Sequence, residues 1–339
     1  RRSDGPLAAG GRNDYGQCAV PALPSGLAFV EAAAGESHSV ARRNDGSIVA
    51  WGLNQHGQCG VPALPIGLVY LEIACGRNHT LARRSDGSIV AWGSNSAGQC
   101  AVPALPPGLG YVEIAAGWSH SVARRSDGSI VAWGSNSAGE CAVPPLPPGL
   151  SYVEVSSGTT HNVARRNDGS VVAWGFNPMG QCNVPVLLPG LSFLEVAAGA
   201  NHTAARRSDG RVVAWGDNSA SECNVPPSTP GLTFEGIGLA GYLVLLITPY
   251  PQSHTAVLRS DGSLLAWGYN YAGQCDIPSL RPGLAYAAVT AGGLVSKVTW
   301  PQQRYAGFTA ALLSDGTVIA WGDNAHGQCM VPSPPPGRA

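Results

Sequence analysis

Histidine recurs at one regularly spaced position, and a ring of histidines is a pattern that could bind a metal ion. The six copies are His38, His79, His120, His161, His202 and His254. Copies on neighbouring structural units would lie at least one sheet-packing distance apart, roughly 10 Å, whereas the ligands of one metal ion all lie about 2 Å from it. We therefore predict that the histidines cap turns and that the chain has no metal site.

Eight of the nine cysteines also follow one regular spacing, and Cys75 is the extra one. The regular ones are Cys18, Cys59, Cys100, Cys141, Cys182, Cys223, Cys275 and Cys329. Equivalent positions on adjacent units would exceed the Cα separation of roughly 7 Å that a disulfide allows, and no Cys-x-x-Cys spacing occurs. We predict small buried side chains rather than disulfides. Reduced thiols favour, weakly, an intracellular or organellar compartment.

A recurrent aspartate could be interpreted as a ring of catalytic acids. It lies in Ser-Asp-Gly or Asn-Asp-Gly, at Asp45, Asp86, Asp127, Asp168, Asp209, Asp261 and Asp315. A tight turn explains both the Asp and the Gly that follows it. No Ser/His/Asp set, phosphate-binding loop or carboxylate pair stands out from the repeat, so we expect no enzyme and no cofactor.

These residues belong to a repeat of 41 residues. Its start is marked by Gly26, Gly67, Gly108, Gly149, Gly190 and Gly231. Later boundaries at Gly283 and Gly337 follow steps of 52 and 54 residues, so repeats six and seven carry insertions of 11 and 13 residues. Residues 1–26 form a partial N-terminal repeat, a half-unit, and residues 27–337 form seven complete repeats.

Each repeat predicts four short β-strands and no helix. Residues 111–116 are β-prone, Ser126-Asp127-Gly128 is a hairpin turn, and residues 129–133 form the next strand. The prolines of residues 102–108 lack the amide donors of a central strand, so this segment should cross to the next unit. Four-stranded units of about 40 residues are typical of β-propellers, and we expect seven blades.

The composition limits the possible partners. Lys plus Arg number 20 against 21 Asp plus Glu, so no strong field attracts nucleic acid. The longest apolar run, near Leu243 to Ile247, is far shorter than the roughly 20 residues that span a bilayer. We therefore expect a soluble chain without a membrane span, and the charge gives no hint of a partner.

The motifs Ala-Ala-Gly, His, Ser-Asp-Gly, Ala-Trp-Gly and Gly-Gln-Cys recur in register along the seven repeats, with a substitution in some copies. With them the chain resembles the regulator of chromosome condensation repeat family. The short repeat, with Val-Pro after Gly-Gln-Cys, is most similar to compact members, including the propeller-type β-lactamase inhibitor. The resemblance implies a seven-bladed propeller that binds proteins through its faces and loops.

Repeats one to five share a second feature: an Arg in a strand and a Glu eleven residues before it. The pairs are Glu31 and Arg42, Glu72 and Arg83, Glu113 and Arg124, Glu154 and Arg165, and Glu195 and Arg206. Repeats six and seven have lost both residues. A two-residue loop would place Glu31 opposite Arg42, so we predict bidentate cross-strand ion pairs that specify how blades associate. The alternative is an Arg-lined groove for a partner.

The insertions of repeats six and seven, near residues 242–252 and 293–305, are the candidate partner-binding site. Both fall between the first two strands of neighbouring blades, so we expect two adjacent loops on one face. Aromatic, Arg and apolar side chains are the usual anchors of interfaces. The candidate residues are Tyr242, Leu243, Leu245, Ile247, Tyr250, Trp300, Arg304 and Tyr305. Alternatively, the loops pack on each other or plug the ring.

The sequence therefore predicts a non-enzymatic interaction scaffold or an accessory subunit of a larger assembly. A second possibility is a proteinaceous enzyme inhibitor, and a third is a guanine-nucleotide exchange factor for a small GTPase.

Overall fold

The computed structural model describes residues 13–227, 229, 231–239, 253–295, 305–315, 317–324 and 329. These residues form β-strands, turns and connecting segments, with no helix among them. The strands make seven three-stranded antiparallel sheets, one for each complete repeat. Two compact units divide the described chain after Phe176. No helix that could cross a membrane is present in the described residues.

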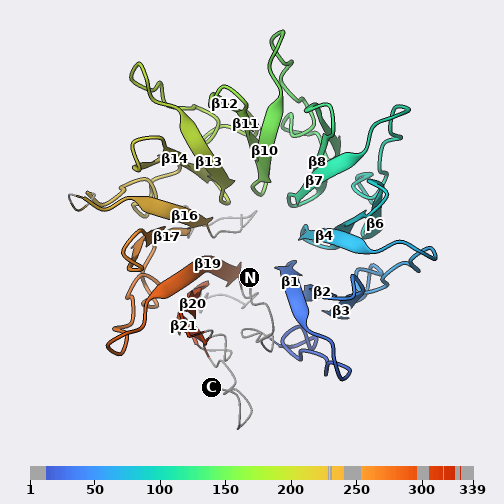
Figure 1. Cartoon of the computed structure of the whole chain (residues 1–339), viewed down its shortest axis with the longest axis horizontal. Helices are drawn as coiled ribbons and strands as arrows, with labels where there is room; N and C mark the ends of the chain where they lie inside the picture. Colours follow the sequence, from blue (N-terminus) through green and yellow to red (C-terminus); the bar gives the residue numbers. More distant parts are fainter. Residues whose placement is uncertain are drawn as a thin grey trace, which may run out of the picture. The chain divides into compact units, whose positions relative to one another are not determined.

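Unit 1 holds the first four sheets. Their strands are β1 (Phe29–Ala34), β2 (His38–Arg43), β3 (Ile48–Gly52), β4 (Tyr70–Cys75), β5 (His79–Arg84), β6 (Ile89–Gly93), β7 (Tyr111–Ala116), β8 (His120–Arg125), β9 (Ile130–Gly134), β10 (Tyr152–Ser157), β11 (His161–Arg166) and β12 (Val171–Gly175). Within this unit the sheets stand side by side in chain order, and the first strand of each lies on the inner side of the row (Figure 1).

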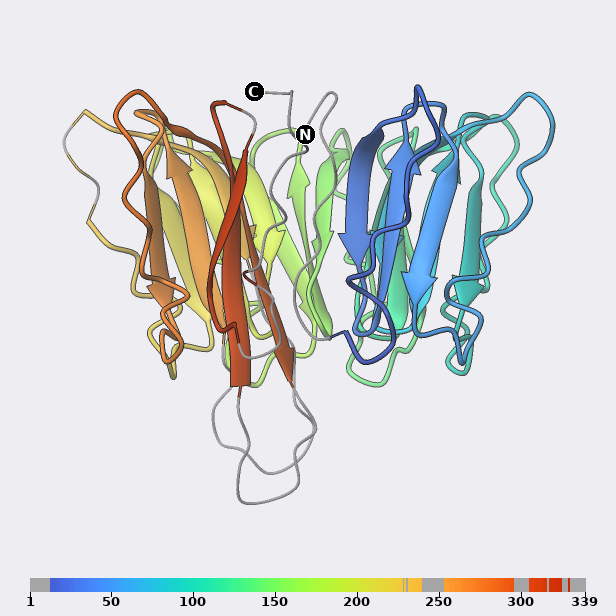
Figure 2. The ribbon, with the colours of Figure 1, turned by 90° about the horizontal axis from the view of Figure 1, so that it is seen from below.

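Unit 2 holds the remaining three sheets. Their strands are β13 (Phe193–Ala198), β14 (His202–Arg207), β15 (Val212–Gly216), β16 (Phe234–Leu239), β17 (His254–Arg259), β18 (Leu264–Gly268), β19 (Tyr286–Val295), β20 (Tyr305–Leu313) and β21 (Val318–Gly322). The strands of each sheet run alternately up and down (Figure 2).

The expected fourth strand of each repeat is absent from the described residues, and this corrects the prediction of four-stranded blades. Residues 94–110, which follow β6, form turns and extended connections instead. Their backbone groups are bonded locally: Cys100 N donates to Asn95 Oδ1 at 2.8 Å, and Ala101 N donates to Gly98 O at 2.9 Å. Prolines at 103, 106 and 107 remove further donors that a strand would need.

Each sheet is shaped by two tight connections. The first connection joins the first strand of each sheet to the second. Between β1 and β2, for example, Gly35 N donates to His38 O at 2.9 Å. The second is the predicted Asp-Gly turn, in which Ser129 N and Ser129 Oγ both donate to Asp127 Oδ1, and Gly128 has a φ of 80°. Because positive φ strains residues with a Cβ, the glycine is needed there. The turn role predicted for the recurrent Asp is confirmed.

The core lies between successive sheets. Trp133 of β9 is 7% exposed and packs in one cluster with side chains from the preceding and its own sheet. The other buried members of that cluster are Leu81, Ile89, Tyr111, Ile114 and Ala123. Equivalent clusters recur in both units. Burying a side chain of this size contributes about 2–3 kcal/mol, so the sheets are held together mainly by their apolar faces.

Part of the N-terminal partial repeat packs on the first sheet of unit 1. Gln17 O accepts hydrogen bonds from Trp51 Nε1 at 2.8 Å and from Ser39 Oγ at 2.9 Å. Val20 and Leu23 pack against the cluster that contains Trp51. In the next repeat Gln58 O serves Trp92 in the same way at 2.9 Å. The partial repeat thus covers the first sheet as each complete repeat covers the sheet that follows it.

Candidate functional site

Most residues of the predicted partner-binding site lie outside the described residues. These are Tyr242, Leu243, Leu245, Ile247, Tyr250, Trp300 and Arg304. In the element order, residues 240–252 connect β16 to β17 and residues 296–304 connect β19 to β20. Whether the two segments are adjacent, bind a partner or plug a ring stays a prediction.

The insertion of the seventh repeat is partly strand rather than loop. β19 and β20 contain 10 and 9 residues, whereas the equivalent strands of the other sheets contain 6. Their register continues from Thr290 opposite Ala310 to Val295 opposite Tyr305. Tyr305 therefore starts a strand. Because β19 and β20 are longer than the equivalent strands, the segment that connects them is residues 296–304, which is shorter than the insertion predicted at residues 293–305.

The Glu–Arg pairs form as the register predicted, with Glu31 directly opposite Arg42. A β-bulge between Phe29 and Glu31, absent from the prediction, precedes each pair and sets its phase. Arg Nε to Glu Oε2 distances lie between 2.7 and 3.1 Å. The side chains are 18–28% exposed, so both charges are largely withdrawn from water.

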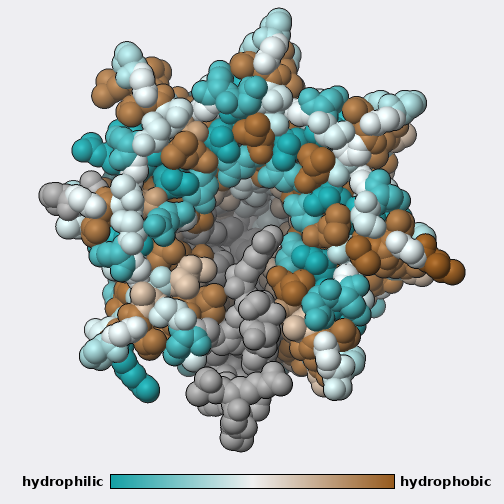
Figure 3. Space-filling model, viewed as in Figure 1, coloured by the Kyte–Doolittle hydropathy of each residue, from teal (hydrophilic) through white to brown (hydrophobic). Residues whose placement is uncertain are grey.

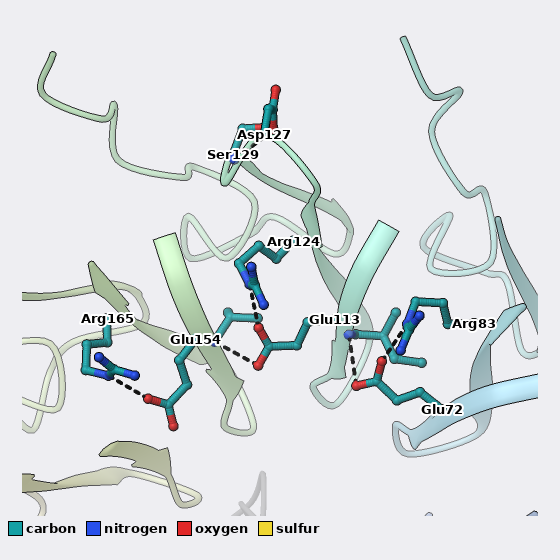
Figure 4. Close-up of polar contacts among 10 residues, drawn as sticks. Glu72, Arg83, Glu113, Arg124, Asp127, Ser129, Glu154 and Arg165 are labelled. Atoms are coloured by element: carbon teal, nitrogen blue, oxygen red, sulfur yellow. Dashed lines mark hydrogen bonds and ion pairs between the residues drawn. The ribbon is translucent and has the colours of Figure 1, made fainter. Parts of the chain in front are cut away.

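The second carboxylate oxygen of these glutamates joins consecutive sheets, which corrects the expected bidentate pairing. Glu72 Oε2 accepts from Arg83, while Glu72 Oε1 accepts from the backbone N of Ile114 on the next sheet at 3.3 Å (Figure 4). Glu31 and Glu113 bind the next sheet in the same way, at 3.2 Å.

Burial raises the pKa of Glu72 more than Arg83 and the Ile114 N–H lower it. The pair therefore offsets the desolvation of its charges and adds little net stability. Its geometry favours a link between sheets over an exposed groove for a partner.

The recurrent histidines also link consecutive sheets, rather than capping their own turns as predicted. His79 Nε2 lies 3.0 Å from Ser121 Oγ of the next sheet, and His120 Nε2 lies 2.8 Å from Asn162 Oδ1. Ser121 Oγ donates its hydrogen to Gln99 O at 2.8 Å, so His79 Nε2 must carry the hydrogen that joins the two side chains. The ring is therefore the neutral Nε2–H tautomer.

The environment of these histidines excludes the charged form. Gly76 N donates to His79 O, and a Cβ on Gly76 would lie 2.1 Å from His79 Cε1, so only glycine fits against the ring. His79 Nδ1 is buried and has no acceptor among the described residues. Burial lowers the pKa of His79 to about 3, and that of His38, His202 and His254 to about 4.

The cysteines are half-buried, whereas the sequence predicted buried side chains, and none of the nine forms a disulfide. Cys100 Sγ donates to Ser94 O at 3.2 Å, and other copies make the same contact six residues back. Burial raises the pKa of Cys100 to about 11, which disfavours the reactive thiolate. In the described part of the chain no group of three His, Cys, Asp or Glu side chains could hold a metal ion.

Glu36, Arg77 and Trp118 form a charged and aromatic cluster on unit 1 that the sequence analysis did not predict. These residues occupy one equivalent loop position in three successive sheets. Arg77 Nε and Nη2 donate to Glu36 Oε2 and Oε1 at 2.8 and 3.3 Å, and the Arg77 guanidinium lies 4.5 Å from the centre of the Trp118 ring. Backbone bonds from Glu36 N to Arg77 O and from Arg77 N to Trp118 O connect the loops. The signal in the sequence was the variation of this position among nearly identical repeats.

Exposed apolar residues occur elsewhere, on the segments that connect one repeat to the next. Ile66, Val186 and Leu188 are 106%, 99% and 71% exposed. Apolar groups are visible at projecting tips in Figure 3. They are scattered and do not form one patch, so they are not a candidate binding site. They are suitable positions for control substitutions.

The seven sheets share one sequence pattern, and within each unit consecutive sheets are joined by recurrent His contacts, so the chain is a repeat protein. The pattern of the Regulator of chromosome condensation (RCC1) repeat matches residues 29–58, 71–99, 111–140, 152–181, 193–221, 252–274 and 305–328. The matches span more than half of the chain, and the chain belongs to this family.

Several solved structures have a similar fold and a low sequence identity to this chain. Human WBSCR16 is 20% identical over 80% of this chain and 86% of its own, with a TM-score of 0.60. Prp20p from Saccharomyces cerevisiae is 18% identical over 77% and 80%, with a TM-score of 0.60. The ectodomain of the Arabidopsis thaliana receptor kinase ACR4 is 20% identical over 91% and 98%, with a TM-score of 0.59. A comparison with curated protein sequences finds no match.

Proposed function

We propose that the chain is a non-enzymatic interaction scaffold or an accessory subunit of a larger assembly, built as a closed β-propeller of seven blades. The segment after the third strand of each repeat takes the place of a fourth strand. Support for closure comes from the seven sheets and from the inter-sheet contacts that recur within each unit.

The observation that carries the proposal is where the repeat loses its regularity. The strands of repeats one to five are nearly identical, whereas repeats six and seven insert apolar and aromatic segments between their first two strands. The packing of regular sheets does not require these segments. Apolar and aromatic residues added to an otherwise regular surface are typical of protein interfaces. The relative Prp20p is described with its binding to Gsp1p and histones, which supports a protein partner in general.

The test is a triple substitution, Leu243→Ser, Leu245→Ser and Trp300→Ser, in the whole chain. We expect the variant to keep its far-UV circular dichroism spectrum and melting temperature and to lose its partner in pull-downs from the source cells. Three interface anchors together should contribute several kcal/mol of binding. A triple variant that unfolds would show that the segments support the ring, and one that still binds would place the interface elsewhere.

The matched control replaces three exposed apolar residues of the connecting segments, by Ile66→Ser, Val186→Ser and Leu188→Ser. These side chains are 71–106% exposed, so the control changes surface hydropathy by a similar amount without altering the insertions. It should bind as the unmodified chain does. The identity of the captured protein separates the alternatives: several subunits indicate a scaffold, a single enzyme an inhibitor, and a small GTPase an exchange factor.

A further inference from the structure

Two buried carboxyl groups follow β15 in unit 2. Asp217 is 6% exposed and Glu222 is 0% exposed. One oxygen of each is bonded to the local turn: Asp217 Oδ1 accepts from Ser219 N at 2.9 Å, and Glu222 Oε2 accepts from Ala220 N at 2.8 Å. The other two oxygens, Asp217 Oδ2 and Glu222 Oε1, are buried without a hydrogen-bond partner in the described chain. A buried polar atom without a partner is costly and requires an explanation.

The equivalent site in the second repeat shows how the two side chains meet. Trp92-Gly93-Ser94 aligns with Trp215-Gly216-Asp217, and Gln99 aligns with Glu222. There Gln99 Nε2 donates to Ser94 Oγ at 3.4 Å. In the second repeat the two side chains therefore lie within hydrogen-bonding distance of each other. In the fifth repeat both have become acids, so the same contact can form only when one carboxyl carries a proton.

The other repeats place at most one acid at these two positions. The third repeat combines Ser135 with Glu140, and the seventh combines Asp323 with Gln328. The remaining repeats have no acid at either position. The chain thus contains the neutral pair, each single-acid form and one double-acid form on the same backbone. The double form is a local departure from the repeat, and it occurs next to the repeat that carries the first insertion.

The pair lies against the next sheet. Trp267 Nε1 of β18 donates to Glu222 O at 2.8 Å, and the backbone N–H of Ser253, directly before β17, interacts with the Glu222 carboxyl. The titratable neighbours are Cys223, whose Sγ donates to Asp217 O at 3.1 Å, and His202 and His254, which begin β14 and β17. Neither carboxyl has an ion pair with Lys or Arg in the part of the chain that the structure describes.

We propose that Glu222 keeps a proton beside Asp217 and that the pair acts as a pH-sensitive link between the sheets β13–β15 and β16–β18. With the proton bound, Glu222 donates to Asp217, as Gln99 donates to Ser94 in the second repeat. Loss of the proton leaves two buried like charges, and Asp217 Oδ2 has no hydrogen-bond donor among the described residues. The link then weakens beside Ser253, where the insertion of the sixth repeat returns to the sheet.

The electrostatics fix the direction of the effect. Burial raises the pKa of Glu222, the Asp217 charge raises it further, and backbone N–H groups of residues 220, 222 and 253 lower it less. The folded chain therefore holds this proton more tightly than the unfolded chain. Stability from the proton is fully present below the ordinary pKa of Glu, 4.5, and is lost as the pH rises through the raised value. Over that range the unfolding constant rises up to tenfold per pH unit.

The experiment compares thermal melts of the whole chain and the Glu222→Gln variant between pH 4 and pH 8. Near pH 4 the two should melt alike, and with rising pH the unmodified chain should fall progressively below the variant. Contributions from the buried histidines are common to both and cancel. A difference that does not change with pH, or that grows toward low pH, overturns the proposal. Stabilisation of the unmodified chain by added Ca²⁺ at pH 8, abolished in Glu222→Gln, would also overturn it, because the pair would then be ionised and bind a cation.

A transplanted pair provides the matched control. The double substitution Ser94→Asp with Gln99→Glu installs both acids in the second repeat and should create the same loss of stability with rising pH. Asp217→Ser, which leaves a single acid as in the third repeat, should reduce the pH dependence. Hydrogen exchange localises the effect: exchange of residues 253–259 should exceed the intrinsic pH trend in the unmodified chain only. Equal exchange in Glu222→Gln would refute the link to the next sheet.

Discussion

Trp133 and Trp321 offer a controlled measurement of one inter-sheet hydrogen bond. The two side chains are 7% and 8% exposed and occupy the same position of the repeat. Trp133 Nε1 donates to Gln99 O at 2.9 Å, whereas Trp321 Nε1 is buried with no acceptor among the described residues. Replacing either by Phe removes a similar volume, so the difference between the two substitutions isolates the bond.

The magnitude follows from what each change leaves behind. In Trp133→Phe the Gln99 carbonyl keeps the hydrogen bond from Ser121 Oγ at 2.8 Å, so no buried acceptor is orphaned. A net hydrogen bond then contributes about 1 kcal/mol. Trp133→Phe should therefore destabilise by about 1 kcal/mol more than Trp321→Phe, because Trp321 Nε1 has no acceptor among the described residues. Trp133→Ala, which empties the cavity between two sheets, should cost about 3–5 kcal/mol.

Urea unfolding followed by far-UV circular dichroism measures these differences as shifts of the midpoint at constant slope. Hydrogen exchange of the flanking strands reports the same loss locally. Equal midpoint shifts for the two Phe variants would refute the role assigned to the Gln99 carbonyl. A cost below about 1 kcal/mol for Trp133→Ala would show that this ring does not fill the space between sheets.

Two further predictions concern the other inter-sheet contacts. The charge exchange Glu31→Arg with Arg42→Glu should destabilise the chain less than either single substitution. It should not restore full stability, because the hydrogen bond from Ile73 N to Glu31 Oε1 is lost. Additive losses of stability in a double-mutant cycle measured by urea unfolding would contradict the ion pair. Burial lowers the pKa of His79 to about 3, so the neutral ring stabilises the fold above pH 6.5, and this stability is lost as the pH falls toward 3. The melting temperature should therefore depend less on pH between pH 7 and pH 4 in the His79→Gln variant. An unchanged pH dependence would contradict the assignment of a buried neutral His79.

Local patterns predicted the hairpins and their register correctly. The alternation of strand residues and the two-residue loop at Glu36 were enough to place Glu31 opposite Arg42, because both depend on neighbours within one hairpin. The bulge at Phe29 escaped prediction, since an extra residue leaves no mark in the apolar pattern. The prediction of a fourth strand, which came from propellers in general, was wrong. Asn95 and Gly98 form local turns, and the prolines lack the amide donors that a strand needs.

Contacts between sheets were beyond prediction from one sequence. The spacing of the histidines indicated a structural role, but their partners, such as Ser121 for His79, lie 42 residues away and become evident only when the sheets stack. The same holds for the second oxygen of Glu72 and for the stacking of Arg77 on Trp118. For the inserted segments, the residue types and the position in the repeat stay predictions from the sequence.

The hydrogen bond from Trp51 Nε1 to the Gln17 carbonyl has a consequence for the synthesis of the chain. Trp51 receives its carbonyl partner from a segment that is made 34 residues earlier, and Trp92 and Trp133 receive theirs at the same interval. A chain that leaves the ribosome with its N-terminus first therefore brings out each acceptor before the indole that needs it. Each of these first three sheets therefore emerges after the segment that covers its Trp, so its apolar face is exposed only briefly. Folding can then follow translation one repeat at a time.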